Sequence, residues 1–174
     1  IEALKHLIKK KNKHIDIVAL PDKGDKGKDG WQPSFRKFAI DNGINIVSLN
    51  QIYKIKNLYL FSLEYRDILK IDRFKSDMLY NIHFSLLPKF RGCHTNFLQI
   101  LKGEKYSGVT LHKIDKGIDT GPIISQMKFV ININDTGYQN YKKLMKYSFL
   151  IFKKNFLKIL RNKIKSKKQN LKLG

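Results

Sequence analysis

Cysteine and long apolar segments are nearly absent from this sequence. Cys93 is the only cysteine among 174 residues, which excludes an intramolecular disulfide. No pair of Cys or His residues has the spacing of a zinc site, so we expect no metal and a reducing, cytoplasmic setting. No segment reaches the ~20 apolar residues that cross a bilayer, and the first residues lack the uninterrupted apolar core of a signal peptide. We therefore expect a soluble protein without a membrane partner.

Acidic residues are scarce as well. The chain has 14 Asp and Glu against 35 Lys and Arg, which gives a formal net charge of +21 at pH 7. Such a charge usually indicates nucleic acid or an anionic surface as a partner. Only five of the basic residues are Arg, however, and nucleic-acid readers depend on Arg for bidentate and stacking contacts. The composition therefore favours a solvated lysine-rich surface, and a basic face for RNA or a small anionic substrate is the alternative.

The distribution of apolar residues predicts one α/β domain. At this length, 42% hydrophobic residues are enough for a genuine core. Helical spacing predicts helices at residues 1–12, 33–43, 96–103 and 138–165. Short β-rich segments predict strands at residues 15–20, 44–49, 58–63, 78–83, 107–114 and 122–131. Strands that alternate with helices indicate a twisted, mostly parallel sheet with flanking helices.

The two ends of the chain depart from this pattern. A chain of this type normally begins with a strand, whereas Ile1, Leu4 and Leu7 open it with a helix. We therefore expect that a first strand and the loop after it are missing, and a helix-first chain is the alternative. Residues 165–174 are polar and basic, so we expect a loosely ordered basic tail.

Two polar side chains lie at the end of one predicted strand. The segment NIHFSLLPKFRG, residues 81–92, places Asn81 and His83 on one face of the strand before the chain breaks into a loop. Sheets of this kind bind ligands beyond the carboxyl ends of their strands. Asn81 offers a neutral amide donor for an oxygen that becomes negative, and His83 exchanges protons near neutral pH. The alternative is that both are hydrogen-bonded residues of the core.

A carboxylate is needed to orient such a histidine. The segment HKIDKGIDTGP, residues 112–122, supplies Asp115 and Asp119 in a glycine-flanked loop. An ordinary turn is the alternative, because Asp and Gly are common turn residues.

Together these segments resemble the formyltransferase family that uses 10-formyltetrahydrofolate. The resemblance is carried by NIHFSLLPKFRG, by GVTLHKIDKGIDTGPIISQ (108–126) and by the Asp-Thr pair at 135–136, and it extends over residues 1–160. It implies a Rossmann-like formyltransferase fold, with residues 1–164 as a catalytic domain that lacks its first strand. It also implies that Asn81, His83 and Asp119 form the catalytic set, whereas Asp115 matches a variable position.

The resemblance implies how these residues act. An amine attacks the formyl carbon, Asn81 and protonated His83 stabilise the oxyanion, and Asp119 orients His83 and helps to remove the amine proton. The pterin of the folate co-substrate is expected against the loop that carries the aspartate. That wall comprises Asp115, Lys116, Gly117, Ile118 and Gly121.

Three branches of this family differ in the amine that they formylate. The segments SLEYRDILK (62–70), NIHFSLLPKFRG and GVTLHKIDKGIDTGPII resemble most the branch that acts on nucleotide-linked amino sugars for surface polysaccharide, typically a dTDP-4-amino-4,6-dideoxyhexose. Glycinamide ribonucleotide and methionyl-tRNA are the alternative substrates. A truncated, inactive relative that serves as a basic binding module is the non-enzymatic alternative.

The nucleotide diphosphate of such a substrate needs cations close to the site. Lys89 and Arg91 follow the catalytic strand and are candidates, with solvated side chains as the alternative. Trp31 stands in a glycine-rich polar loop and could stack on a base or sugar, or pack on the sheet edge. The apolar stripe of residues 138–165 predicts a core helix or a homodimer helix.

Overall fold

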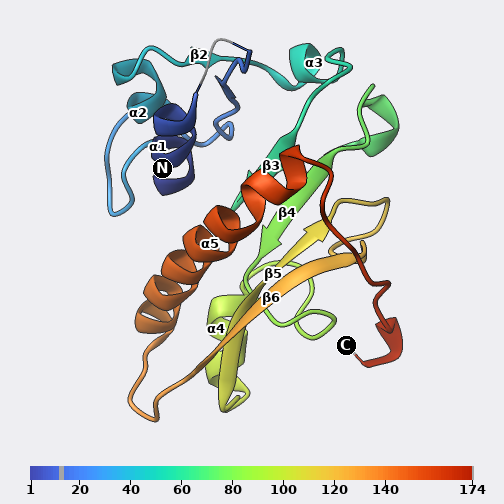
Figure 1. The fold of residues 1–174 in the computed structure, drawn as a ribbon. Helices are drawn as coiled ribbons and strands as arrows, with labels where there is room; N and C mark the ends of the chain where they lie inside the picture. Colours follow the sequence, from blue (N-terminus) through green and yellow to red (C-terminus); the bar gives the residue numbers. More distant parts are fainter. Residues whose placement is uncertain (12–13, 174) are drawn as a thin grey trace. The chain divides into compact units, whose positions relative to one another are not determined.

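The computed structural model describes residues 1–11 and 14–173, in two compact units. Unit 1 comprises Ile1–Leu58 and Tyr65–Ser76, and unit 2 comprises Tyr59–Glu64 and the chain from Asp77 onward (Figure 1). The candidate catalytic residues Asn81, His83 and Asp119 all belong to unit 2.

Unit 1 is a small α/β assembly. Its helices are α1 (Glu2–Lys10), α2 (Phe35–Asp41), α3 (Leu49–Ile52) and the 3-10 helix η1 (Ile71–Arg73). Its strands, β1 (Val18–Ala19) and β2 (Asn45–Ile46), pair in parallel. Both are shorter than the sequence predicts.

Local sequence explains where α2 begins and what it buries. The hydroxyl of Ser34 accepts a hydrogen bond from the N–H of Lys37 (2.9 Å) and so caps the helix. Gly43, with φ +65°, follows its end. Ala39 joins Leu4, Ala19 and Ile44 in a buried cluster that holds α1, α2 and both strands together.

Unit 2 is built on a four-stranded sheet in the order β3-β4-β5-β6. The strands are β3 (Leu60–Leu63), β4 (Leu79–His83), β5 (Tyr106–Lys113) and β6 (Ile123–Val130). Its helices are α4 (Thr95–Leu101), α5 (Gly137–Leu160) and the 3-10 helix η2 (Leu171–Leu173).

The α/β class is confirmed, but the sheet is less parallel than predicted. β3 and β4 run parallel, whereas β4–β5 and β5–β6 are antiparallel. Residues 114–122 join β5 to β6 by too short a connection for a parallel crossover, which needs a dozen residues or more. The sequence pattern predicts where the strands lie, but it does not determine whether neighbouring strands run parallel or antiparallel.

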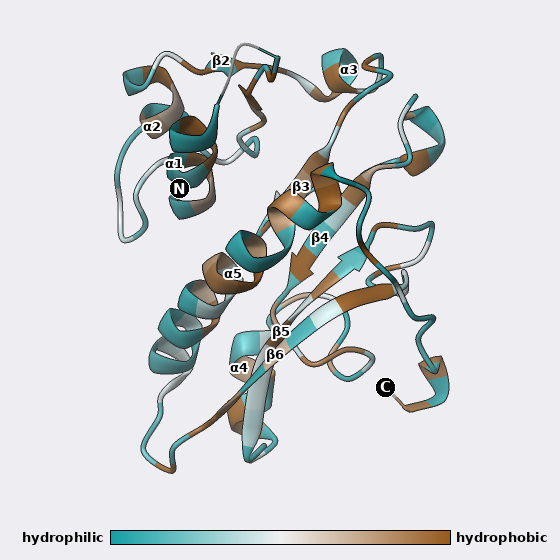
Figure 2. Cartoon of the chain, viewed as in Figure 1, coloured by the Kyte–Doolittle hydropathy of each residue, from teal (hydrophilic) through white to brown (hydrophobic). Residues whose placement is uncertain are grey.

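Helix α5 supplies much of the core of unit 2. It contacts β5 and β6, and its apolar stripe buries Leu144, Ile151 and Ile159. Phe61 of β3 meets the rings of Phe152 and Phe156 at centroid distances of 5.2 and 6.0 Å. Figure 2 shows hydrophobic (brown) and hydrophilic (teal) parts recurring along α5, as expected of a helix with one apolar stripe. In the described part of the chain, no helix combines the length and the apolar character that crossing a membrane needs.

The segment after α5 is tied to the sheet rather than loosely ordered. Lys167 and Ile123 exchange two backbone hydrogen bonds of 2.8 Å each, at the start of β6. Figure 1 shows this segment, in dark red, returning past the connection between β5 and β6. The prediction of a loose tail considered only its polar composition, and the contact is made by backbone groups that composition does not reveal.

Candidate active site

Strand β4 positions the first two candidate residues. Asn81 pairs with Ser62 of β3 and with His112 of β5, and His83 pairs with Thr110 of β5. Residues two apart on a strand face the same side, so Asn81 and His83 point together as the sequence predicts. His83 is buried, with 7% of its surface exposed.

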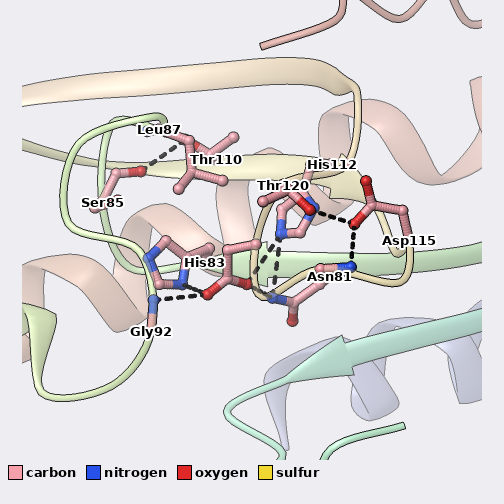
Figure 3. Close-up of polar contacts among 12 residues, drawn as sticks. Asn81, His83, Ser85, Leu87, Gly92, Thr110, His112, Asp115 and Thr120 are labelled. Carbon is pink, nitrogen blue, oxygen red and sulfur yellow. Dashed lines mark hydrogen bonds and ion pairs between the residues drawn. The ribbon is translucent and has the colours of Figure 1, made fainter. Parts of the chain in front are cut away.

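The carboxylate of Asp119 joins these two side chains. One oxygen, Oδ2, lies 3.4 Å from Nδ1 of His83 and accepts a hydrogen bond from the N–H of Gly92 (2.9 Å). The other, Oδ1, accepts a hydrogen bond from Nδ2 of Asn81 (3.1 Å) and lies 3.4 Å from Nε2 of His112. Figure 3 shows Asn81, His83 and His112 converging from β4 and β5. The structure thus brings together three residues that lie up to 38 positions apart in the chain.

Both ring nitrogens of His83 face acceptors. Nε2 lies 2.6 Å from the carbonyl oxygen of Phe90 and must carry a proton to bind it, while Nδ1 faces Asp119. Burial lowers the pKa of His83, and the Asp119 carboxylate and the Phe90 carbonyl counteract part of that effect. Protonation of His83 would let both ring nitrogens donate, Nε2 to Phe90 and Nδ1 to Asp119. Burial therefore favours the neutral ring, whereas these two acceptors favour the protonated ring.

Asp119 is ionised in this environment. Burial raises the pKa of its carboxyl group, but the His112 ring, the His83 ring and the Gly92 N–H together outweigh that effect and lower the pKa. The backbone at Asp119 has φ +53°, a conformation that residues other than glycine rarely adopt. A charged, buried carboxylate at a strained backbone position is typical of functional sites.

His112 is the member of this cluster that the sequence analysis did not single out. Its Nδ1 donates to the carbonyl oxygen of Lys113 (2.8 Å), and its Nε2 lies 3.3 Å from Nδ2 of Asn81. When neutral, His112 accepts from Asn81, and when protonated at Nε2 it can donate to Asp119. His112 stands in the segment GVTLHKID, but its position opposite Asn81 depends on the register of β4 and β5, which the sequence does not show.

The amide of Asn81 already has partners. Its two N–H bonds reach Asp119 Oδ1 and His112 Nε2. Donation to an oxyanion therefore requires Asn81 to exchange one of these bonds for the substrate oxygen. Such an exchange is compatible with catalytic geometry, because ligand-free sites often tighten only when substrate is bound.

Hydrogen bonds of the Thr110 hydroxyl anchor the loop after β4. Thr110 of β5 donates to the carbonyl oxygen of Ser85 (2.6 Å) and accepts from the N–H of Leu87 (3.1 Å) and from Nε2 of Gln126 (2.8 Å). Thr110 is fully buried. Because Phe90 and Gly92 belong to this loop, its anchoring also fixes two of the groups that surround His83 and Asp119.

The loop between β5 and β6 is shaped by Asp115. Its Oδ1 accepts from the N–H of Gly117 (3.2 Å) and from the hydroxyl of Thr120 (2.6 Å). A Cβ added at Gly121 would collide with the carbonyl oxygen of Lys113, so this position requires glycine. The contacts of Asp115 are within the loop, which favours a structural role for its carboxylate.

The other predicted ligand residues have different environments. Lys116, Gly117 and Ile118 are exposed at the tip of the loop, and 60% of the surface of Ile118 is accessible. Lys89 lies 3.3 Å from Glu104, an exposed ion pair that competes with any phosphate.

Arg91 is half-buried in unit 2, on the same loop as Lys89. Trp31 belongs to unit 1 and is 75% exposed. Across residues 1–11 and 14–173 no group of three or more His, Cys, Asp or Glu side chains could hold a metal ion.

Chemically, the cluster combines an amide donor, a histidine that can carry a proton and an ionised carboxylate. This set can stabilise negative charge on a substrate oxygen and accept a proton from a nucleophile. Residues 69–153, which contain all of these side chains, match the formyl transferase family. This part of the chain is a formyl transferase domain.

Two curated proteins illustrate what the chain is similar to in sequence. The bifunctional polymyxin resistance protein ArnA of Wigglesworthia glossinidia brevipalpis is 43% identical over 122 residues, which cover 69% of this chain and 19% of ArnA. The methionyl-tRNA formyltransferase of Thermodesulfovibrio yellowstonii is 34% identical over 156 residues, which cover 83% of this chain and 51% of that enzyme.

A solved structure resembles nearly all of this chain. The sugar 3N-formyl transferase WlaRD, solved in the presence of dTDP and 5-N-formyl-THF, is 50% identical, with a TM-score of 0.93. The match covers 97% of this chain and 62% of WlaRD. The chain thus spans less than two thirds of the length of each of these relatives.

Proposed function

We propose that the protein transfers the formyl group of 10-formyltetrahydrofolate to the amino group of a dTDP-linked amino sugar, for surface polysaccharide synthesis. The observation that carries the proposal is the Asp119 carboxylate, which holds Asn81 and His83 together at the end of β4. The resemblance to WlaRD supports both co-substrates, since that enzyme is a sugar 3N-formyl transferase solved with dTDP and a formyl-folate.

The geometry supports a direct transfer. The amine nitrogen attacks the formyl carbon, a C–N bond forms, and the carbonyl oxygen takes the negative charge. Asn81 and protonated His83 each exchange one of their present hydrogen bonds for that oxygen and stabilise it. The ionised Asp119 accepts a proton from the amine, directly or through water. The carbonyl then re-forms as the bond from carbon to the folate nitrogen breaks, and that nitrogen takes the proton held by Asp119 and leaves as tetrahydrofolate.

The loop between β5 and β6 is the proposed wall of the folate site. It is bonded internally through Asp115, and Gly121 allows close backbone packing against the end of β5. The residues at its tip, Lys116 to Ile118, are exposed and are proposed to meet the flat pterin ring. Lys89 and Arg91 are proposed to face the diphosphate, and Trp31 the base or sugar.

The position of the amine on the sugar is a separate part of the proposal. The sequence analysis favours a 4-amino-4,6-dideoxyhexose, whereas WlaRD, at 50% identity, is a 3N-formyl transferase. We therefore propose the 3-amino sugar as the substrate and keep the 4-amino sugar as the comparison that the assay must include.

Methionyl-tRNA is the second candidate substrate. It is favoured by the similarity to the Thermodesulfovibrio enzyme and by the net charge of +21, which would attract RNA. Glycinamide ribonucleotide is the third amine that this family formylates, and only the general family resemblance supports it.

Residues 1–164 as catalytic domain, residues 165–174 as basic tail, a cytoplasmic location and a homodimer remain parts of the proposal. The single cysteine, Cys93, is exposed and forms no disulfide, which suits a reducing compartment. Much of the apolar stripe of α5 is buried within unit 2, so the dimer would have to use other surfaces of the chain.

The test is a formyl-transfer assay with the full-length protein. Purified protein is incubated with 10-formyltetrahydrofolate and, in parallel, with dTDP-3-amino and dTDP-4-amino sugars, glycinamide ribonucleotide and methionyl-tRNA. Formation of a formamido sugar, lost in His83→Ala and Asp119→Ala, is the expected result. Formylation of the tRNA alone would establish the second candidate, and the absence of any turnover by folded protein would refute the enzyme.

A further inference from the structure

The segment after α5 reaches the loop that carries Asp119. Backbone hydrogen bonds between Lys167 and Ile123 bring the segment to the start of β6. Two residues later, Nε2 of Gln169 donates to the carbonyl oxygens of Asp119 (2.9 Å) and Gly121 (2.7 Å). One side-chain amide therefore spans the two peptide carbonyls on either side of Thr120.

The chemistry of these contacts fixes how the Gln169 amide is oriented. Both partners are carbonyl oxygens, which only accept, so the NH2 end must face them and not the oxygen end. The oxygen Oε1 is buried and has no hydrogen-bond partner among the described residues. The donor end alone therefore determines the position of the side chain, and both of its hydrogens are used on the Asp119 loop.

The backbone that Gln169 holds is strained. Asp119 has φ +53°, which a residue with a Cβ adopts only when the surrounding structure imposes it. Gly121 packs closely against the carbonyl oxygen of Lys113 on the opposite side of the loop. Both β5 and Gln169 thus contact this loop. The carboxylate of Asp119, in the same loop, has polar groups of four other residues at distances between 2.9 and 3.4 Å.

We propose that Gln169 is a positioning residue for formyl transfer, which sets the backbone of Asp119 so that the carboxylate bridges Asn81 and His83. This inference rests on the proposed function. Gln169 acts only through the two carbonyls, and the reacting atoms are touched by Asp119 itself. A displacement of a catalytic group by about 1 Å can cost about 10²-fold in rate. The basic tail, residues 165–174, accordingly contributes a positioning residue to the catalytic domain, although it follows α5.

The experiment compares Gln169→Leu with Asn170→Ala in the full-length protein. Leu is one atom shorter than Gln169 but of similar bulk and has no donor, whereas Asn170 is an exposed neighbour whose side chain accepts from the N–H of Lys172. For Gln169→Leu we expect kcat to fall by about 10- to 100-fold, with KM for the amino sugar changed by less than about threefold. Asn170→Ala should retain the wild-type kcat.

A second readout separates positioning from a general loss of stability. The titration of His83, followed by NMR, reports the distance of the Asp119 charge, which raises the pKa of His83. We expect the titration midpoint of His83 to fall in Gln169→Leu and to stay unchanged in Asn170→Ala. A kcat equal to wild type, or a lowered kcat with an unchanged His83 midpoint, overturns the inference.

The two readouts also distinguish this inference from the proposed function. If the wild-type protein transfers no formyl group, the proposed function fails, and a shifted His83 midpoint in Gln169→Leu still supports the hold of Gln169 on Asp119. Should Gln169→Leu not fold, Gln169→Ala removes the same donors without adding an apolar branch. The same two measurements then decide.

Discussion

Replacement of Asp119 by Asn tests the role of the carboxylate at nearly constant size. The carboxylate lies within 3.4 Å of Asn81, His83, His112 and the N–H of Gly92. An amide has one acceptor oxygen, so in Asp119→Asn its NH2 group must face at least one donor of this set. The variant thus loses the negative charge, and its new NH2 group faces the N–H of either Asn81 or Gly92.

The magnitude follows from the distance to His83. Unit charges 3.4 Å apart at an effective dielectric constant of about 20 interact by about 5 kcal/mol, and both side chains are almost fully buried. This is the upper limit of what Asp119 contributes to a protonated His83. Since about 1.4 kcal/mol corresponds to a tenfold change in rate, we expect kcat to fall by about 10³-fold. The pKa of His83 should fall further, because the charge that opposes burial is gone.

The assay is single-turnover formyl transfer at saturating folate and amino sugar, with Asp115→Asn as the matched comparison. Asp115 lies in the same loop, and its Oδ1 alone accepts both of its hydrogen bonds, so an amide oxygen can replace it. Asp115→Asn should therefore lose much less rate than Asp119→Asn. A wild-type rate in Asp119→Asn, or equal losses in the two variants, would refute the reasoning.

Three further predictions concern stability. His83 and Asp119 both have lowered pKa values in the fold, so the unfolded chain binds more protons and the free energy of unfolding must fall as pH falls, first below 6.5 for His83 and then below 3.8 for Asp119. Denaturant unfolding on both sides of pH 6.5 checks this, and His83→Ala should abolish the first decrease. Gly121→Ala should lower the free energy of unfolding by about 1–3 kcal/mol, because the added Cβ would collide with the carbonyl oxygen of Lys113 at the end of β5. Gly30→Ala should lower it far less, because a Cβ at Gly30 meets nothing within 4 Å. Equal losses in the two variants would contradict the packing at Gly121. Thr110→Val should lower the free energy of unfolding by about 3 kcal/mol, because it leaves the buried partners of the Thr110 hydroxyl unpaired. Thr110→Ser keeps the hydroxyl and should retain most of the stability. An unchanged stability in Thr110→Val would show that these hydrogen bonds contribute nothing.

Local sequence patterns predict most of the helices and strands, and they place two of the site residues, Asn81 and His83, together. The amphipathic spacing of residues 138–165 predicts α5, which is found at Gly137–Leu160. The two-residue period of a strand predicts that Asn81 and His83 share one face, and they do. The proximity of Asp119 to both was implied only by the resemblance to formyltransferases, because a loop between strands has no periodicity from which to read its direction.

Long-range contacts account for what the sequence did not show. His112 enters the cluster through the antiparallel register of β4 and β5, and Gln169 through a backbone pairing near the end of the chain. Thr95, the first residue of α4, donates its hydroxyl to the carbonyl oxygen of Phe84 (2.8 Å). Each of these partners lies more than ten residues away, beyond the range of a local pattern.

A crystal structure of the full-length protein with a formyl-folate and a dTDP-linked amino sugar would test the central claim most directly. The account predicts the formyl oxygen within hydrogen-bonding distance of Asn81 and His83, and the amine nitrogen about 3–3.5 Å from the formyl carbon on the side of Asp119. A formyl group bound away from these three side chains, with the Asp119 carboxylate still engaged only by its present partners, would contradict it.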